Sequence, residues 1–104
     1  MQIIFKNQLL VEIYADKKIS NSLFQPDVIK SFKKTIIKLH LCQNITELNF
    51  YKGLKYQKLQ GNLLGYSSVR LNNKYRLIFI ELSLNDISIH TDTLEIIEIS
   101  NHYQ

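Results

Sequence analysis

The sequence predicts an α+β domain in which an N-terminal strand and two helices pack on an antiparallel sheet of three to four strands. Three observations carry this prediction: an apolar run at residues 2–5, a helical apolar stripe after Pro26, and apolar strand-like segments within residues 66–100. Helices that precede a run of strands favour packing on one face of an antiparallel sheet. At 104 residues the chain suffices for one hydrophobic core, so we expect one domain over residues 1–104.

The first elements are a short strand and a short helix. Residues 2–5 are apolar and typical of a strand. Asn7, a residue type that favours helix N-caps, precedes apolar residues at helical spacing: Leu9, Leu10, Ile13 and Tyr14. The polar residues 16–25 are expected to form a connection.

The clearest helix begins at Pro26 and is expected to end near Cys42. Proline suits the first helical position because its missing N–H would be unpaired there, and Asp27 places a negative charge in the first turn. Residues 46–50 could add a short helical turn. One apolar stripe of the long helix is expected to face the sheet: Ile29, Phe32, Ile36 and Leu39.

The second half is predicted to be mostly sheet. Residues 51–65 contain all three glycines and are expected to form a loop around a short run at 55–59. A polar loop is expected at 83–93, with a strand-like stretch at 87–89. Apolar content and bounding turn residues predict strands at 66–71, 75–82 and 94–100.

A tight turn between two of these strands sets the geometry of two arginines. The turn contains Asn72 and Asn73, and asparagine readily adopts the positive φ that hairpin turns require. A three-residue turn places Arg70 directly opposite Arg76 on one sheet face, whereas a two-residue turn places them on opposite faces. Only the first arrangement lets both guanidinium groups reach one phosphate easily.

Positive charge is concentrated in the first part of the chain. Residues 1–60 carry 10 lysines and 4 acidic residues, whereas residues 61–104 carry 3 basic and 5 acidic residues. Two interpretations remain open: a solvated lysine-rich helix face, or a basic surface that attracts a polyanion such as RNA. A basic and aromatic segment supplies the candidate RNA-binding residues, although it could also be a solvated loop: Lys52, Lys55, Tyr56, Gln57 and Lys58.

Several motifs follow one another in the second half: Leu59-Gln60-Gly61, Tyr66 to Arg70, the tight turn, and Tyr75-Arg76-Leu77-Ile78-Phe79. In this order they resemble the RelE/ParE superfamily of bacterial type II toxins, and most closely its HigB branch of plasmid-maintenance killer proteins. The C-terminal pair His102-Tyr103 is similar to the end of toxins of the YoeB branch. The resemblance in element order covers nearly the whole chain, while the specific motifs lie between residues 53 and 104.

The resemblance implies a toxin that cleaves mRNA on the ribosome without a metal ion. Arg70 and Arg76 correspond to the catalytic arginines of the YoeB branch, and His102 and Tyr103 to its proton-transfer pair. Such cleavage uses the 2′-OH of RNA as nucleophile, so the protein must accept a proton, stabilise the phosphorane-like transition state and protonate the leaving 5′-oxygen. Arginine binds phosphate oxygens in a bidentate manner, and histidine titrates near neutrality.

Two positions depart from the family pattern. Gln57 falls where the YoeB branch has an acidic general base and some HigB toxins have histidine, and Gln60 falls where both branches often have lysine. Because glutamine cannot take up a proton at neutral pH, either His102 supplies the base or turnover is reduced.

Each candidate residue also has a structural alternative. Arg76 could form an ion pair with a nearby acidic residue, Arg70 could point to solvent, and the C-terminal pair could be a frayed tail. The acidic residues in question are Glu81, Glu95 and Glu98.

The resemblance also sets the expected partners: a helix-turn-helix (HigA-like) antitoxin, the ribosome and mRNA. A single cysteine, Cys42, allows no internal disulfide, and no Cys/His cluster indicates zinc, so we expect neither a metal nor a small-molecule cofactor. No signal-type or membrane-spanning apolar run is present, so we expect a cytoplasmic protein without membrane contact. Two alternatives remain, a ParE-like toxin that inhibits gyrase and a degenerate toxin that only binds its antitoxin.

Overall fold

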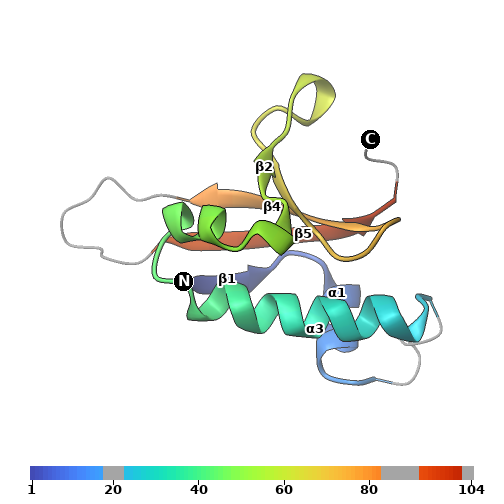
Figure 1. The fold of residues 1–104 in the computed structure, drawn as a ribbon. Coiled ribbons are helices and arrows are strands. Elements are labelled where there is room, and N and C mark those ends of the chain that lie inside the picture. Colours follow the sequence, from blue (N-terminus) through green and yellow to red (C-terminus); the bar gives the residue numbers. More distant parts are fainter. Residues whose placement is uncertain (18–22, 83–91, 102–104) are drawn as a thin grey trace.

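The computed structural model describes residues 1–17, 23–82 and 92–101, and it consists of a helical layer packed on one face of a sheet (Figure 1). The expected loop at 83–93, with its strand-like stretch at 87–89, lies almost wholly outside the described residues. The helices are α1 (Gln8–Tyr14) and α3 (Pro26–Leu41), with short 3-10 helices η1 (Ile45–Phe50), η2 (Lys52–Leu54) and η3 (Gly61–Leu63). The strands are β1 (Gln2–Phe5), β2 (Gln57–Lys58), β3 (Ser67–Arg70), β4 (Arg76–Leu82) and β5 (Thr93–Ser100).

The α+β prediction is confirmed, with two differences in the sheet. The sheet has five strands in the order β1-β5-β4-β3-β2, rather than three to four, and β1 lies parallel to β5. The additional edge strand β2 has only two residues, too few to show an alternating pattern. The apolar run of β1 carries no information on direction, so its parallel pairing was not visible in the sequence.

Both predicted helices begin at the expected residues. Asn7 is the N-cap of α1, where its Oδ1 accepts a hydrogen bond from the Leu9 N–H at 2.9 Å. Its Nδ2 also donates to the Ile97 carbonyl at 3.2 Å, which ties the start of α1 to β5. Pro26 is the first residue of α3, and the helix ends at Leu41. Within the described ranges, neither helix combines the length and apolar character needed to cross a membrane.

The core lies between α3 and the sheet, as predicted. Phe32, Ile36 and Leu39 are at most 3% exposed. Ile29 is only partly buried, because Val28 takes the more central position at 1% exposure. The sheet contributes buried residues that alternate along its strands: Val69, Leu71, Leu77, Phe79, Leu94, Ile96 and Ile99.

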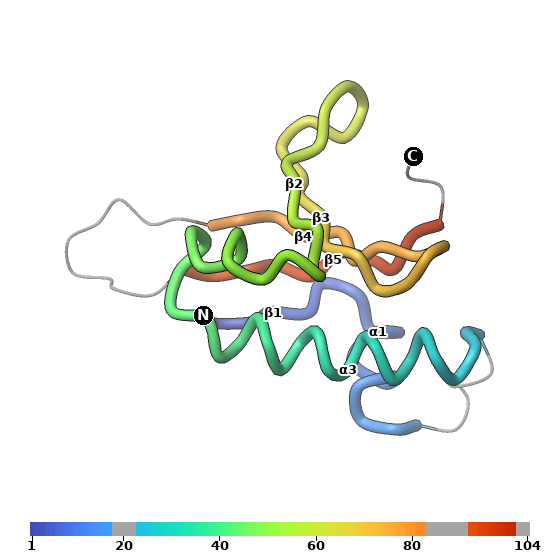
Figure 2. Tube along the Cα trace, in the orientation of Figure 1, coloured from blue at the N-terminus to red at the C-terminus, as the bar shows by residue number. Residues whose placement is uncertain are grey.

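The second face of the sheet is turned away from the helices. Because side chains alternate along a strand, Arg76 and Ile78 lie on the face opposite Leu77 and Phe79. Figure 2 shows the segment between β2 and β3 rising on this side of the sheet, away from α3. A register shift between β4 and β5 at Ile78 and Phe79 leaves Ile97 as an extra residue in β5, which is a β-bulge.

Candidate functional site

The two predicted arginines lie side by side on the helix-free face. Arg70 of β3 and Arg76 of β4 are Cα partners. The turn between the strands therefore consists of the three residues 72–74, between Leu71 and Tyr75. Of the two turn lengths that the sequence left open, the structure has the three-residue turn. Directly paired residues project to the same face of a sheet, which is the arrangement that a shared phosphate would require.

Arg76 is oriented by two hydrogen bonds from different segments. Its Nε donates to the Ser68 Oγ at 2.9 Å, and its Nη2 donates to the Lys55 carbonyl at 2.6 Å. Ser68 is fully buried, so its hydroxyl is a fixed acceptor. Lys55 has φ 46° and ψ 50°, a left-handed conformation that is uncommon for a residue other than glycine. The guanidinium group is thus held between β3 and the loop before β2.

The acidic residues considered as partners of Arg76 occupy different environments. Glu81 is five positions from Arg76 along β4, and because side chains alternate along a strand it faces the helix side. There its Oε2 accepts a hydrogen bond from Ser67 Oγ at 2.5 Å. Glu95 Oε2 lies 3.8 Å from Lys6 Nζ. An ion pair between Arg76 and Glu81 is therefore excluded by the strand geometry.

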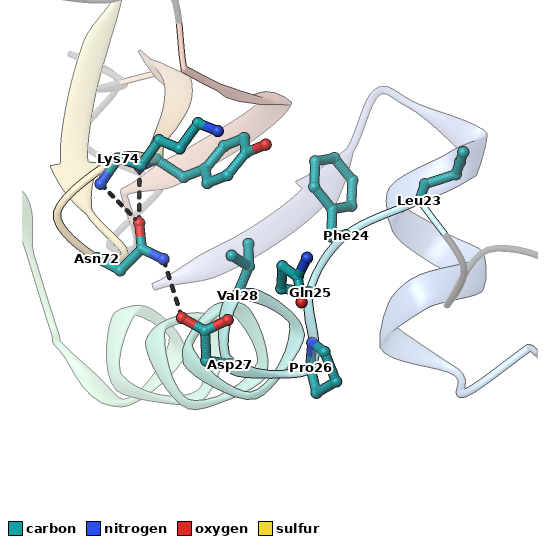
Figure 3. Close-up of a pocket in the computed structure, with 9 residues that line it drawn as sticks. Leu23, Phe24, Gln25, Pro26, Asp27, Val28, Asn72 and Lys74 are labelled. Carbon is teal, nitrogen blue, oxygen red and sulfur yellow. Dashed lines mark hydrogen bonds between the residues drawn. The ribbon is translucent and has the colours of Figure 1, made fainter.

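Arg70 is folded back onto the turn. Its Nε donates to the Asn72 carbonyl at 3.2 Å, and its Nη2 donates to Asn73 Oδ1. The side chain of Asn72 fixes the turn, since Oδ1 accepts from the backbone N–H of Lys74 at 2.9 Å and Nδ2 donates to Asp27 Oδ2 at 3.1 Å (Figure 3). The two guanidinium groups therefore share a face but bind different segments, and Arg70 must leave the turn to join Arg76 at one phosphate.

A cavity of about 370 Å³ lies beside this turn and the start of α3 (Figure 3). Asn72, Lys74 and Tyr75 line it from the hairpin, and the segment from Leu23 to Val28 lines it from the helix side. The predicted catalytic arginines do not line it. We therefore place the candidate site on the sheet face and not in this cavity.

The predicted RNA-binding segment has two kinds of residue. Four of its side chains are exposed: Lys52, Lys55, Gln57 and Lys58. Tyr56 is half-buried, its ring is stacked on Phe79 with centroids 6.3 Å apart, and its hydroxyl donates a hydrogen bond to Glu81. Burial, followed by the hydrogen bond to Glu81, raises the pKa of Tyr56. The contacts of Tyr56 are thus made inside the protein, so we infer a structural role for it.

Gln57 lies next to the anchored arginine. It pairs with Ser68, the residue that accepts from Arg76, and it is exposed. Gln60 is exposed at the start of η3. Gln57, where the resemblance led us to expect a proton acceptor, therefore lies on the Arg76 face.

The predicted proton-transfer pair, His102 and Tyr103, lies outside the described residues. β5 ends at Ser100, whose Cα partner is Arg76. The last residue of β5 is therefore directly beside Arg76 in the sheet.

Sequence reasoning missed the residues that position Arg76. Ser68 was seen only as part of a strand, and no pattern indicated that the Lys55 carbonyl would turn toward the arginine. The alternation that puts Ser68 on the same face as Arg70 was the available signal. In the described parts of the chain, no group of three or more His, Cys, Asp or Glu residues is placed to hold a metal ion.

Comparisons with known proteins agree with this architecture. Residues 3–94 match the family of the RelE-like toxin of type II toxin-antitoxin system HigB. The chain is 32% identical over 79 residues to Toxin HigB-1 of Vibrio cholerae serotype O1, covering 76% of this chain and 82% of that protein.

Two solved structures show the same fold at low sequence identity. The YoeB/ParE toxin from Agrobacterium tumefaciens has a TM-score of 0.60 at 16% identity, over 99% of this chain and 100% of that one. A heterotetrameric YoeB-YefM toxin-antitoxin complex from Staphylococcus aureus matches with a TM-score of 0.50 at 23% identity, over 99% and 98%. Together, the family match and the Vibrio relative establish that this chain belongs to the HigB family of RelE-like toxins from type II toxin-antitoxin systems.

Proposed function

We propose that this toxin is a metal-independent endoribonuclease that cleaves mRNA on the ribosome and thereby inhibits translation. The observation that carries the proposal is the orientation of Arg76 by Ser68 and the Lys55 carbonyl on a helix-free sheet face, next to Arg70 and Gln57. A guanidinium that is held in place before substrate arrives can stabilise charge that develops at phosphorus without reorganisation.

In this mechanism Arg76 binds the non-bridging oxygens of the scissile phosphate. Arg70 exchanges its hydrogen bonds to Asn72 and Asn73 for a second contact to the phosphate when RNA binds. The 2′-OH attacks phosphorus, His102 removes its proton, and the 5′-oxygen leaves as it is protonated. Each proton transfer by a positioned side chain contributes roughly 10²–10⁴ in rate. Tyr103, the other member of the predicted C-terminal pair, is the candidate that protonates the leaving 5′-oxygen.

The exposed lysines of the loop before β2 extend this surface toward the RNA backbone. Lys58 of β2 instead pairs with Ser67, and its Nζ lies 4.0 Å from Glu81 Oε1 on the helix side. Lys52 and Lys55 lie on the segment that supplies the second anchor of Arg76. They add positive charge where phosphates flanking the cleavage position would lie. The ribosome would hold the mRNA in the productive geometry, which compensates for a site with few catalytic groups.

The proposed partner is an antitoxin of the HigA-like, helix-turn-helix class. Membership of a toxin-antitoxin family supports an antitoxin partner, and the structurally similar YoeB is known in complex with YefM. Co-purification of the toxin with the product of a neighbouring helix-turn-helix gene tests this assignment, and a toxin that remains alone would contradict it.

The decisive experiment compares growth arrest with RNA cleavage. Induced wild-type toxin should arrest translation, and new mRNA 5′ ends should map to the ribosomal A site. Arg76→Ala should lower cleavage by about 10²–10³-fold, the range for loss of one preorganised donor. Lys30→Ala, which removes an exposed charge on α3 on the other side of the sheet, should leave cleavage unchanged. Arrest that follows DNA damage while mRNA stays intact would instead identify a gyrase inhibitor.

One observation favours a second candidate, a toxin that binds its antitoxin but cleaves poorly. Gln57 occupies the position next to Arg76 where the resemblance places a base, and it cannot accept a proton. Gln57→Glu restores a carboxylate and should raise the cleavage rate if the base is the missing part. A wild-type toxin that folds, binds its antitoxin and leaves growth and mRNA unaffected would support this candidate.

A further inference from the structure

A hollow of about 190 Å³ lies next to the residue that anchors Arg76. It is formed by η1, η2 and the loop before β2, at the edge of the sheet. Its lining residues are Leu48, Asn49, Tyr51, Lys52, Lys55 and Tyr56. Lys55 belongs both to this lining and to the site, because its carbonyl accepts the hydrogen bond from Arg76 Nη2 at 2.6 Å. Lys55 therefore connects the hollow with Arg76, the residue proposed to bind the scissile phosphate.

The lining combines three chemical features. Leu48 is fully buried and Tyr56 is half-buried, and they give the hollow an apolar and aromatic floor. Tyr51 is 43% exposed, so its ring is accessible to a planar partner. Asn49 is an exposed amide with both donor and acceptor capacity, and its Nδ2 makes only a long hydrogen bond of 3.4 Å to the Thr46 carbonyl.

Positive charge surrounds the same hollow. The side chains of Lys52 and Lys55 are exposed at its rim. Lys38 Nζ lies 5.5 Å from the centroid of the Tyr51 ring, a cation–π contact that holds the ring before any ligand arrives. The left-handed conformation of Lys55 is a strained backbone geometry of the kind that clusters at binding sites.

We propose that this hollow binds one nucleobase of the RNA, that of a nucleotide adjacent to the scissile phosphate. The base stacks on Tyr51, the amide of Asn49 bonds its edge, and Lys52 and Lys55 contact the flanking phosphates. Proteins read single-stranded RNA by this combination of aromatic stacking and hydrogen bonds to base edges. A phosphate alone would not need the apolar floor, and an apolar ligand would not match the lysine rim.

The subsite rests on the proposed ribonuclease function, and it deepens that function by naming the residues that select the cleavage position. Asn49 and Tyr51 are specificity residues in this arrangement and take no part in the bond-breaking step. Their replacement should therefore change where the toxin cleaves more than whether it can cleave.

The test uses Tyr51→Ala and Asn49→Ala, with Phe50→Ala as the matched control. Phe50 is a neighbouring aromatic residue that is 73% exposed and does not line the hollow. All three positions are exposed, so the variants should remain folded, which circular dichroism and thermal melting verify. Cleavage positions are then mapped on ribosomes programmed with an mRNA library. Because every base can stack on an aromatic ring, Tyr51→Ala should weaken RNA binding at the hollow by about 5- to 150-fold, the range for loss of one base stack. Asn49→Ala should instead relax the preference among bases at the cleavage position.

A second measurement does not require cleavage. Short 2′-O-methyl RNAs that differ in one base are titrated into the wild-type toxin, and the NMR signals of the Asn49 side-chain amide and the Tyr51 ring are followed. Shifts at these two residues that depend on the identity of the base support the subsite even if the toxin proves unable to cleave. Active variants with an unchanged cleavage pattern, or signals that stay fixed while RNA binds elsewhere, would overturn it. An RNA that neither binds nor is cleaved would overturn both proposals.

Discussion

Replacing Ser68 by alanine tests whether the orientation of Arg76, beyond its charge, supports cleavage. Ser68 is fully buried in β3, and its Oγ accepts the hydrogen bond from Arg76 Nε at 2.9 Å. Alanine removes this acceptor and leaves the charge of the arginine intact. The partly exposed guanidinium can then reach water, so the change should affect its direction more than its solvation.

The expected size follows from the two anchors of Arg76. A hydrogen bond to a charged group contributes about 1.5–3 kcal/mol. The bond to the Lys55 carbonyl at 2.6 Å remains in the variant and preserves part of the orientation. We therefore expect a loss of about 1–2 kcal/mol in transition-state stabilisation, which is roughly 5- to 30-fold in rate. This loss should be smaller than the roughly 10²–10³-fold expected for Arg76→Ala.

The neighbouring Ser67 provides a matched control. It is also buried in β3, but its Oγ bonds Glu81 at 2.5 Å on the helix side of the sheet. Ser67→Ala removes a hydroxyl of equal size from the same strand, so it should lower the free energy of unfolding, by about 1–3 kcal/mol. The cleavage rate per folded molecule should stay unchanged, as measured with programmed ribosomes and corrected by urea unfolding.

Two outcomes would refute the reasoning. A folded Ser68→Ala toxin that cleaves at the wild-type rate would show that the hydrogen bond to Arg76 has no catalytic value. An equal loss of cleavage in Ser67→Ala would show that the effect arises from general damage to β3. Only a loss confined to Ser68→Ala assigns a positioning role to that residue.

Three further changes test the interior. Phe32→Ala should lower the free energy of unfolding by about 3–5 kcal/mol in urea, because Phe32 is fully buried; an unchanged midpoint would contradict its central place. The pKa of Tyr56 is raised in the folded state, so its contribution to stability is complete below pH about 10 and declines as pH rises above that value. In urea unfolding at rising pH, the Tyr56→Phe variant should not show this alkaline loss of stability. The same loss in the wild type and the variant would refute the role of Tyr56. Burial also raises the pKa of the Cys42 thiol, so iodoacetamide should react slowly at pH 7 and rapidly in urea, whereas fast native alkylation would exclude burial.

Local signals in the sequence were sufficient for the two helices and the longer strands. Asn7 and Pro26 marked both helix starts because N-cap chemistry and the fixed φ of proline act within a few residues. The pairing of Arg70 with Arg76 depends on a local feature, the length of the turn between them, but the sequence left two- and three-residue turns open. The parallel partner of β1 was not predictable, since that pairing is decided by contacts between residues about 90 positions apart.

The candidate site was predictable only in part for the same reason. The arginines were visible as residue types in a motif, but their hydrogen bonds come from segments that the fold brings together. Ser68 and Lys55 anchor Arg76 from two directions, and the αL conformation of Lys55 has no signature in a lysine side chain. Tyr56 was predicted to contact RNA because it is an aromatic residue between lysines. The sequence does not show whether such a ring faces outward or, as here, packs on Phe79.

The β-bulge in β5 decides toward which face of the sheet the last side chains of that strand point. Leu94 and Ile96, at even positions, are buried on the helix side before the bulge, whereas Ile99, at an odd position, is buried after it. The extra residue Ile97 therefore shifts the alternation by one, and Ser100 is turned to the Arg76 face.

Asn7 links this bulge to the first helix. Its Nδ2 donates to the Ile97 carbonyl at 3.2 Å, while its Oδ1 caps α1. Without the extra residue, a regular β5 would direct the Ser100 side chain toward the helices. The arrangement that puts Ser100 and Arg76 on one face of the sheet thus depends on one extra strand residue, whose carbonyl accepts a hydrogen bond from the N-cap of α1.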